Sequence, residues 1–179
     1  MRLNLGCGRR PKKGWTNVDV QNFGQEIVSD LLDLPLDDEV ADEAMAIHVI
    51  EHFDVWDSEV ALNEWFRVLK PGGQLLVEFP DLRKVISKIR ETDEAELYTP
   101  ENLSWLYGAL YGNYPLKDTW MTHRWTFDPQ DIAGAMLNAG FRPVAILKEP
   151  NYHRVDRDAA VIGYKPGADS NGDSELRRS

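Results

Sequence analysis

Short apolar runs alternate with polar stretches along the chain, and this pattern predicts a sheet of buried strands connected by helices and loops. Apolar residues at helical spacing predict helices over 58–69, 82–90 and 128–138, the last with Asp128 as its cap. Strands separated by helices favour an α/β fold with a mainly parallel sheet. The predicted strands cover residues 3–5, 16–20, 26–29, 44–50, 74–79, 141–147 and 159–164.

Two of these strands end in residues suited to a nucleoside. Gly6, Cys7 and Gly8 follow the first strand, and Asp19 lies near the end of the second. Glycine lets the backbone lie against a ligand, and a carboxylate one strand away can accept hydrogen bonds from ribose hydroxyls. A tight loop without a ligand is the alternative. The dinucleotide fingerprint would need a third glycine where Pro11 stands, so a dinucleotide is disfavoured.

Further candidates fall at the ends of the third and fourth predicted strands, at Asp30 and at Ile47 and His48. In open α/β sheets, ligands bind outside the carboxyl ends of the strands. The convergence of all these residues at strand ends predicts one ligand site there.

Composition narrows the class of protein. The net charge of −10 argues against a broad nucleic-acid-binding face, and no apolar run approaches the length of a membrane span. No signal peptide is visible, and Cys7 is the single cysteine, so a disulfide framework is excluded and a cytoplasmic location is expected. A basic loop is either solvated or attracts an anionic substrate or a cofactor carboxylate; it contains Arg9, Arg10, Lys12 and Lys13.

With these residues placed, the chain resembles the class I S-adenosylmethionine-dependent methyltransferases, and most closely their small type 11 group. The resemblance covers roughly residues 2–164, which we expect to form one methyltransferase domain, with a disordered tail over 165–179. It implies a Rossmann-like fold, mainly parallel, with an antiparallel last strand. The matching segments are Leu-Asn-Leu-Gly-Cys-Gly at 3–8, Asn-Val-Asp at 17–19, Ser-Asp-Leu-Leu-Asp-Leu-Pro at 29–35, His-Val-Ile-Glu-His at 48–52, Arg-Val-Leu-Lys-Pro-Gly-Gly at 67–73 and Ala-Gly-Phe at 139–141.

The resemblance also implies S-adenosylmethionine as the cofactor and assigns its contacts. The glycine turn Gly6–Gly8 would face the methionine part, with Cys7 inside it, and Asp19 would hold the ribose. Asp30 would meet the adenine amino group while Leu31 flanks the ring. Ile47 and His48 would complete the pocket.

The sequence departs from the family pattern near its start. Little room is left for the usual first helix between Gly8 and Asp19, and only residues 21–25 separate the second and third strands. Parallel neighbours usually need a crossover of about a dozen residues. We therefore expect shortened first helices and a thinly covered face of the sheet, which would leave room for a partner subunit and a homodimer.

Residues 91–125 interrupt the alternation of strands and helices and are expected to form an inserted lid over the acceptor site. His123 lies in this segment and is either a structural residue or a general base, because its ordinary pKa is near neutrality. The aromatic side chains form a local core or stack on a sugar or planar ring. They are Trp105, Tyr107, Tyr111, Tyr114, Trp120 and Trp125.

The segment His48-x-x-Glu51-His52 formally matches the H-x-x-E-H pattern of zinc peptidases. That chemistry needs both histidines on one helical face, whereas His48 directly follows a predicted strand. We expect no metal ligands here, with His48 lining the cofactor pocket and His52 forming a structural hydrogen bond.

The predicted activity is therefore transfer of a methyl group from S-adenosylmethionine to a hydroxyl or amine of a small-molecule or sugar-like acceptor. The candidates for a catalytic role are His123, His48 and Asp81, and none is singled out by the sequence. The alternatives are a module that binds S-adenosylmethionine without turnover, and a zinc hydrolase that uses the His-x-x-Glu-His segment.

Overall fold

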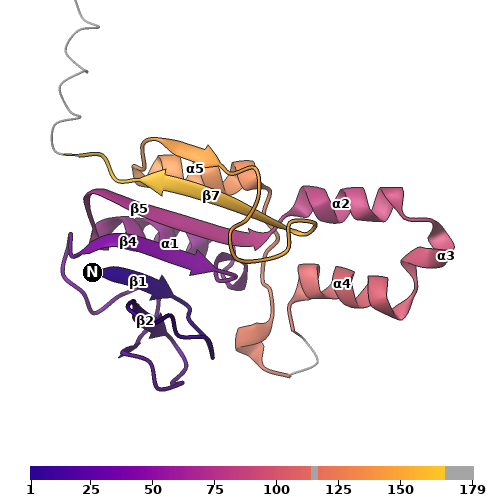
Figure 1. Cartoon of the computed structure of the whole chain (residues 1–179), viewed down its shortest axis with the longest axis horizontal. Coiled ribbons are helices and arrows are strands. Elements are labelled where there is room, and N and C mark those ends of the chain that lie inside the picture. The colour runs from indigo at the N-terminus through magenta and orange to yellow at the C-terminus, as the bar shows by residue number, and fades with distance from the viewer. Residues whose placement is uncertain (114–116, 168–179) are drawn as a thin grey trace, which may run out of the picture.

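The computed structural model describes residues 1–113 and 117–167 of the chain, and a twisted sheet lies at its centre (Figure 1). Within the described residues the sheet has seven strands in the order β3-β2-β1-β4-β5-β7-β6. All neighbours from β3 to β5 are parallel, whereas β7 is antiparallel to both β5 and β6. This confirms the predicted Rossmann-like α/β fold. The strands are β1 (Arg2–Leu5), β2 (Thr16–Asp19), β3 (Ile27–Val28), β4 (Ala41–Ile47), β5 (Leu69–Pro80), β6 (Val144–Ile146) and β7 (Asp158–Tyr164).

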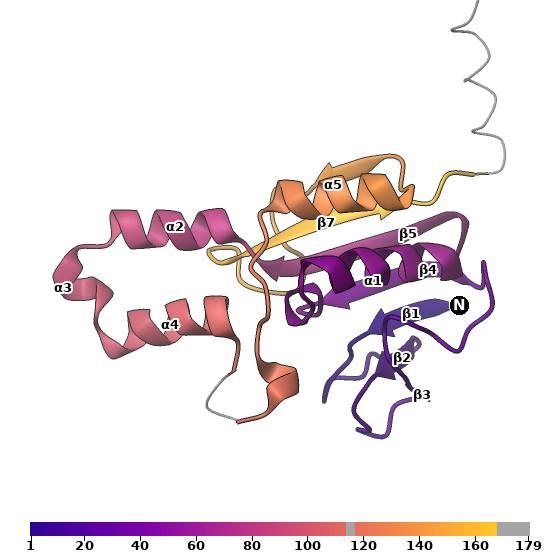
Figure 2. The same ribbon diagram turned by 180° about the vertical axis from the view of Figure 1, so that it is seen from behind.

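Two helices, α1 (Val55–Val68) and α5 (Pro129–Ala139), cover one face of the sheet, as the two opposite views show (Figures 1 and 2). Leu62, Trp65 and Met136 from these helices join alternate strand residues in the buried core. Gly163 on β7 allows this packing, because a Cβ there would lie 2.7 Å from Met136. Burial of apolar side chains between this face of the sheet and the two helices therefore stabilises the fold.

The opposite face has much less cover, as the sequence predicted. No helix among the described residues lies over it in the view of Figure 1. The cross-strand register places Met45, Leu76 and Ile162 side by side on this face. Leu76 and Ile162 are only half-buried there.

The expected short link between β2 and β3 is an extended loop held by side chains. Gln25 donates hydrogen bonds to the carbonyls of Asp19 and Gln21, at 3.2 and 2.8 Å. Glu26 accepts from the backbone and side-chain nitrogens of Asn17, both at 3.0 Å. Side-chain hydrogen bonds thus replace the crossover helix.

Helix boundaries follow the capping residues. Asp128 caps α5 in a capping box, and Gly140 ends the helix in the left-handed conformation at φ 108°, as predicted. Helix α1 begins at Val55, three residues before the predicted start. Asp54 accepts hydrogen bonds from the amides of Trp56 and Asp57 and so fixes the earlier start.

The fourth strand begins and ends three residues earlier than the predicted range of 44–50. The strand β4 covers Ala41–Ile47, and residues Ile50–His52 form the short 3₁₀ helix η1. His48 has a positive φ of 55°, which turns the chain away from the strand direction. Pairing of β4 with both neighbours sets its bounds, and local composition did not reveal this.

Three helices form an arm that projects beyond the carboxyl ends of the strands (Figures 1 and 2). They are α2 (Leu82–Glu91), α3 (Glu94–Leu97) and α4 (Pro100–Tyr111), and the 3₁₀ turn η3 (Thr119–Met121) returns toward the sheet. Most described aromatic side chains in this region are exposed, which disfavours the predicted local aromatic core. Those exposed are Tyr107, Tyr111, Trp120 and Trp125.

Other expectations fall partly outside the described residues. These are Tyr114 in the aromatic segment and most of the predicted tail, residues 168–179. Lys165 still belongs to the fold, because its backbone exchanges hydrogen bonds with Gly72 and Gly73. No helix in the described ranges has both the length and the apolarity to cross a membrane.

Candidate active site

A cavity of about 490 Å³ opens where β1, β2 and β4 end. Most of the residues that the sequence singled out as cofactor contacts line this cavity: Gly6, Cys7, Gly8, Asp19, Asp30, Leu31 and His48. The exception is Ile47, whose neighbours His48 and Val49 line the cavity instead. The fold therefore brings the strand-end segments together around one space.

The glycine turn lies directly against the next strand end. Gly6 has a φ of 65°, and a Cβ on it would collide with the side chain of Val49. Gly8 has a φ of 53° and donates its amide to Asp19 Oδ2 at 2.8 Å. Glycine adopts these positive φ values with little strain, and at position 6 it has no Cβ that would collide with Val49.

Asp19 is 9% exposed and holds the turn in place. Its Oδ1 accepts the amide of Gln21 at 2.9 Å, while Oδ2 accepts that of Gly8. A carboxylate oxygen has two lone pairs, so each oxygen can accept a further hydrogen bond. Asp19 can therefore receive two hydroxyl groups of a ligand without releasing the backbone.

Asp30 and Leu31 form the far wall of the cavity. Asp30 Oδ1 accepts the amide of Leu32 at 3.0 Å. The carbonyl of Leu31 accepts from the indole of Trp65, at 3.0 Å, which ties this wall to the core of α1. Leu31 is buried and places an apolar side chain against the cavity.

Cys7 lies within the turn and is 7% exposed. Burial, followed by the negative charge of Asp19, raises the pKa of its thiol to about 11. The side chain is thus a neutral, weakly polar part of the cavity wall at physiological pH.

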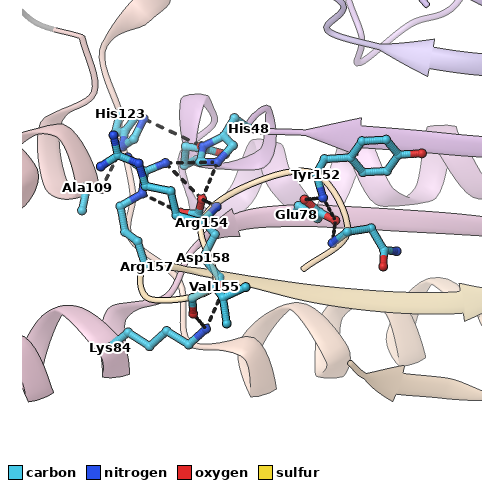
Figure 3. Close-up of polar contacts among 12 residues, drawn as sticks. His48, Glu78, Lys84, Ala109, His123, Tyr152, Arg154, Val155, Arg157 and Asp158 are labelled. Atoms are coloured by element: carbon cyan, nitrogen blue, oxygen red, sulfur yellow. Dashed lines mark hydrogen bonds and ion pairs between the residues drawn. The ribbon is translucent and has the colours of Figure 1, made fainter. Parts of the chain in front are cut away.

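All the histidines of the chain gather beside this cavity: His48, His52, His123 and His153. His48 is linked to two carboxylates, with Nδ1 at 2.7 Å from Glu51 and Nε2 at 3.1 Å from Asp158 (Figure 3). Burial acts to lower the pKa of His48, but these two hydrogen bonds outweigh it and raise the pKa to about 9. His48 is therefore protonated at neutral pH and unsuited to act as a base there.

His123 lines a second cavity of about 400 Å³, next to the first. His48, His52, Met121 and His153 line both cavities, so the two spaces share a wall. The Nδ1 of His123 donates to the carbonyl of Ala109 at 3.0 Å (Figure 3). Burial lowers the pKa of His123, so the ring is neutral at pH 7.

Asp81, the third catalytic candidate, lies in neither cavity. It is 5% exposed and caps α2, accepting the amide of Arg83 at 2.8 Å. Its helix-capping role explains why a carboxylate follows β5, and the structure gives no support to substrate contact.

The basic loop is divided between two environments. Arg9 and Arg10 line the first cavity, where they can meet an anionic group. Lys12 lies instead over the rings of Trp15 and Tyr152, at 4.3 and 4.4 Å from their centroids.

Several cavity residues carried no sequence signal. They lie in the loop after β2, in or beside η3, and in the loop between β6 and β7, namely Gln21, Phe23, Asp118, Met121 and His153. Trp120 also lines the cavity and was one of the aromatic residues expected to stack or pack. Gln21 contacts Asp118 at 3.3 Å and closes one rim of the cavity. Such loop contacts depend on tertiary packing and leave no local pattern.

Comparison with known proteins places these features in a family context. A family model described as a methyltransferase domain matches residues 11–77. A probable S-adenosylmethionine-dependent methyltransferase of Mycolicibacterium smegmatis is 41% identical over 71 residues, which are 40% of this chain and 26% of that protein. The match thus spans about a quarter of the length of that relative.

Solved structures agree in fold across most of the chain. An S-adenosylmethionine-dependent methyltransferase from Methanosarcina mazei has a TM-score of 0.61 at 17% identity, covering 93% of this chain and 92% of its own. One from Archaeoglobus fulgidus has a TM-score of 0.61 at 18% identity, covering 92% and 85%.

A third is 1,6-didemethyltoxoflavin-N1-methyltransferase from Burkholderia thailandensis, solved with S-adenosylhomocysteine and 1,6-didemethyltoxoflavin. It has a TM-score of 0.58 at 17% identity, covering 92% of this chain and 70% of its own. The resemblance found in the sequence is thereby confirmed: the chain shares the methyltransferase-domain signature over residues 11–77 and has the Rossmann-like fold of S-adenosylmethionine-dependent methyltransferases.

Proposed function

We propose that this protein is a methyltransferase that binds S-adenosylmethionine in the first cavity and methylates an acceptor held in the second. The observation that carries the proposal is the lining of the first cavity, in which three strand-end segments and His48 meet. Each segment supplies the residue type that one part of the cofactor requires.

The proposed cofactor position follows from these residue types. The ribose hydroxyls bind the unused lone pairs of Asp19, and the adenine lies against Leu31 with its amino group toward Asp30. The methionine part lies along the Gly6–Gly8 turn, where Arg9 or Arg10 can meet its carboxylate.

The second cavity supports turnover rather than binding alone. A module that only holds the cofactor needs no neighbouring space, whereas these cavities share a wall of histidines and Met121. In the transfer, an oxygen or nitrogen lone pair of the acceptor forms the bond to the methyl carbon. The carbon–sulfur bond breaks, its electrons stay on sulfur as a thioether, and the acceptor proton passes to water. Alignment of the two groups supplies much of the rate.

The acceptor class that fits is a small molecule with a hydroxyl or amine. The cavity of about 400 Å³ has the size of small-ligand sites. The Burkholderia enzyme of similar fold was solved with the small molecule 1,6-didemethyltoxoflavin. The arm of α2, α3 and α4 borders the cavity through Ser104 and Gly108, so we assign it the role of lid.

Substitution of Asp19 tests the cofactor site. Asp19→Ala removes charge-assisted hydrogen bonds to the ribose and should weaken S-adenosylmethionine binding about 10- to 100-fold by calorimetry. Asp33→Ala is the matched control, because Asp33 is an exposed carboxylate outside the cavity. Asp19 also holds two backbone amides, so Asp19→Asn and thermal melting separate a binding defect from misfolding. Unchanged affinity in folded Asp19→Ala protein would refute the assignment.

Transfer itself is tested with methyl-labelled cofactor and a metabolite extract. We expect label in a small-molecule product that depends on intact Asp19. Cofactor binding without labelled product from any fraction would favour the binding module instead.

A further inference from the structure

Three side chains beside the second cavity form a cluster with the composition of a metal site. Glu51, His52 and His123 each offer one ligand atom, and these atoms all lie within 4.8 Å of one another. The Nε2 of His123 is 3.7 Å from Glu51 Oε1, and the two histidine rings are 5.0 Å apart at their centroids. Small shifts of these side chains would bring three ligands around one ion.

A separate observation on the Glu51 carboxylate indicates a ligand at this cluster. The residue is 1% exposed, and its Oε1 is hydrogen-bonded to His48. Its Oε2 is buried and has no hydrogen-bond partner among the described residues. Leaving a buried carboxylate oxygen unpaired is costly, so a ligand at this atom would remove a penalty.

Both histidines are oriented as metal ligands commonly are. The Nδ1 of His52 lies 3.1 Å from the carbonyl of Thr122, and that of His123 lies 3.0 Å from Ala109. Because a carbonyl only accepts, each Nδ1 must carry the proton. A neutral ring in this tautomer presents the lone pair of Nε2. A backbone carbonyl that fixes a histidine in this tautomer is typical of the outer shell of metal sites.

The neighbouring cluster of His48, His153 and Asp158 does not offer the same opportunity. The guanidinium of Arg157 already bonds Asp158 at 2.7 and 3.1 Å and lies 3.3 Å from His48 Nε2 (Figure 3). A fixed cation thus fills the position that a metal ion would take. The structure separates His48 and His52 into two clusters, so the His-x-x-Glu-His pairing is not used.

We propose that Glu51, His52 and His123 bind one divalent transition-metal ion. Two imidazoles and one carboxylate favour zinc, cobalt or iron over magnesium. The Glu51 carboxylate would then supply one ligand oxygen, and His48, hydrogen-bonded to Oε1, would hold it from the outer shell. This assigns His123 to metal binding rather than to proton transfer, and it replaces our expectation of a chain without metal ligands.

Three protein ligands leave at least one coordination position open. His52 and His123 line the second cavity, so the open position would face it. If the proposed function holds, an acceptor oxygen would complete the coordination there. The acceptor would then be a small molecule with an oxygen near its methylated atom.

Metal binding is tested without activity, on protein first stripped with a chelator. Cobalt(II) should bind at one ion per chain and give a visible absorption band. His52→Ala and Glu51→Gln should each weaken cobalt binding by more than about 100-fold. This loss is larger than that caused by removing an outer-shell residue, which weakens metal binding by about 10- to 100-fold. His153→Ala is the control, because this histidine lies beside the cavity outside the proposed ligand set, and it should bind as the parent does.

Circular dichroism shows whether each variant is folded, and His52→Ala is the milder change because His52 is partly exposed. The proposal is overturned if the parent protein binds no cobalt, or if His153→Ala loses it while folded His52→Ala retains it. Calorimetry with S-adenosylmethionine on the metal-free protein gives a separate readout. If the parent protein binds S-adenosylmethionine but no cobalt, this inference is rejected and the proposed function stands.

Discussion

At the scale of single residues, Cys7 shows how burial inside a turn changes the pKa of a side chain. Its thiol is buried beside Asp19, and its pKa is raised from 9.0 to about 11. The native state therefore holds a proton that the unfolded chain releases in this range. The sign follows directly: the contribution of Cys7 to stability falls as the pH rises from 9 to 11.

We expect alkylation of Cys7 by iodoacetamide at pH 8 to be about 100-fold slower in the native protein than in urea, because only the thiolate reacts. Cys7 is the single cysteine of the chain, so mass spectrometry of the labelled protein reads its rate directly. Equal rates in the two states would show that the thiol is exposed and its pKa ordinary.

The sequence was informative at this scale only where residues follow a strand. Gly6, Gly8, Asp19 and Asp30 were found from the pattern because a strand end places its next residues at the edge of the sheet. Asp81 also follows a strand, but it caps a helix, and type and position alone do not distinguish these roles. His153 was missed because its loop approaches the cavity only after folding.

At the scale of elements, the loop between β6 and β7 depends on a buried carboxylate. Glu78 on β5 is fully buried and accepts the amides of Asn151 and Tyr152 (Figure 3). Lys84 on α2 donates to the carbonyls of Val155 and Asp158, at 2.7 and 2.6 Å. These contacts hold His153 at the cavity wall.

Glu78→Ala should release this loop, because two backbone amides lose their acceptor in a buried place. We expect a loss of about 1–3 kcal/mol in the free energy of unfolding by urea. Cleavage by trypsin after Arg154 should become faster than in the parent protein. Gln74→Ala is the control, since Gln74 lies on the same strand but bonds Glu43. A folded Glu78→Ala variant with unaltered stability and cleavage would contradict this role.

Element types could be predicted better than their ends. The helix over 129–139 was recognised because its cap, its first proline and its terminal glycine are all local signals. The bounds of β4 and β5 depend on pairing across the sheet, including an irregularity between Ala41 and Glu43. No window of sequence contains that information.

At the scale of the whole molecule, two apolar surfaces are available to a second copy. One is the open face of the sheet, where Leu76 and Ile162 are already half-buried. The other is the arm, whose helix α2 carries its apolar residues on one face. Only Val85 of that face is buried as a core residue, whereas Ile86 and Ile89 are 45% and 38% exposed. Exposed apolar side chains grouped on one element typically mark an interaction surface.

We therefore expect a homodimer formed through α2, with a mass by light scattering of twice that of the chain. The double substitution Ile86→Asp and Ile89→Asp should give monomers, because it places charges in the buried centre of the contact. Ile146→Asp is the control, since Ile146 is 40% exposed on β6, away from the arm. If Ile162→Asp dissociates the protein and the double substitution does not, the open sheet face is the interface. A monomer at all concentrations of the parent protein would reject the dimer itself.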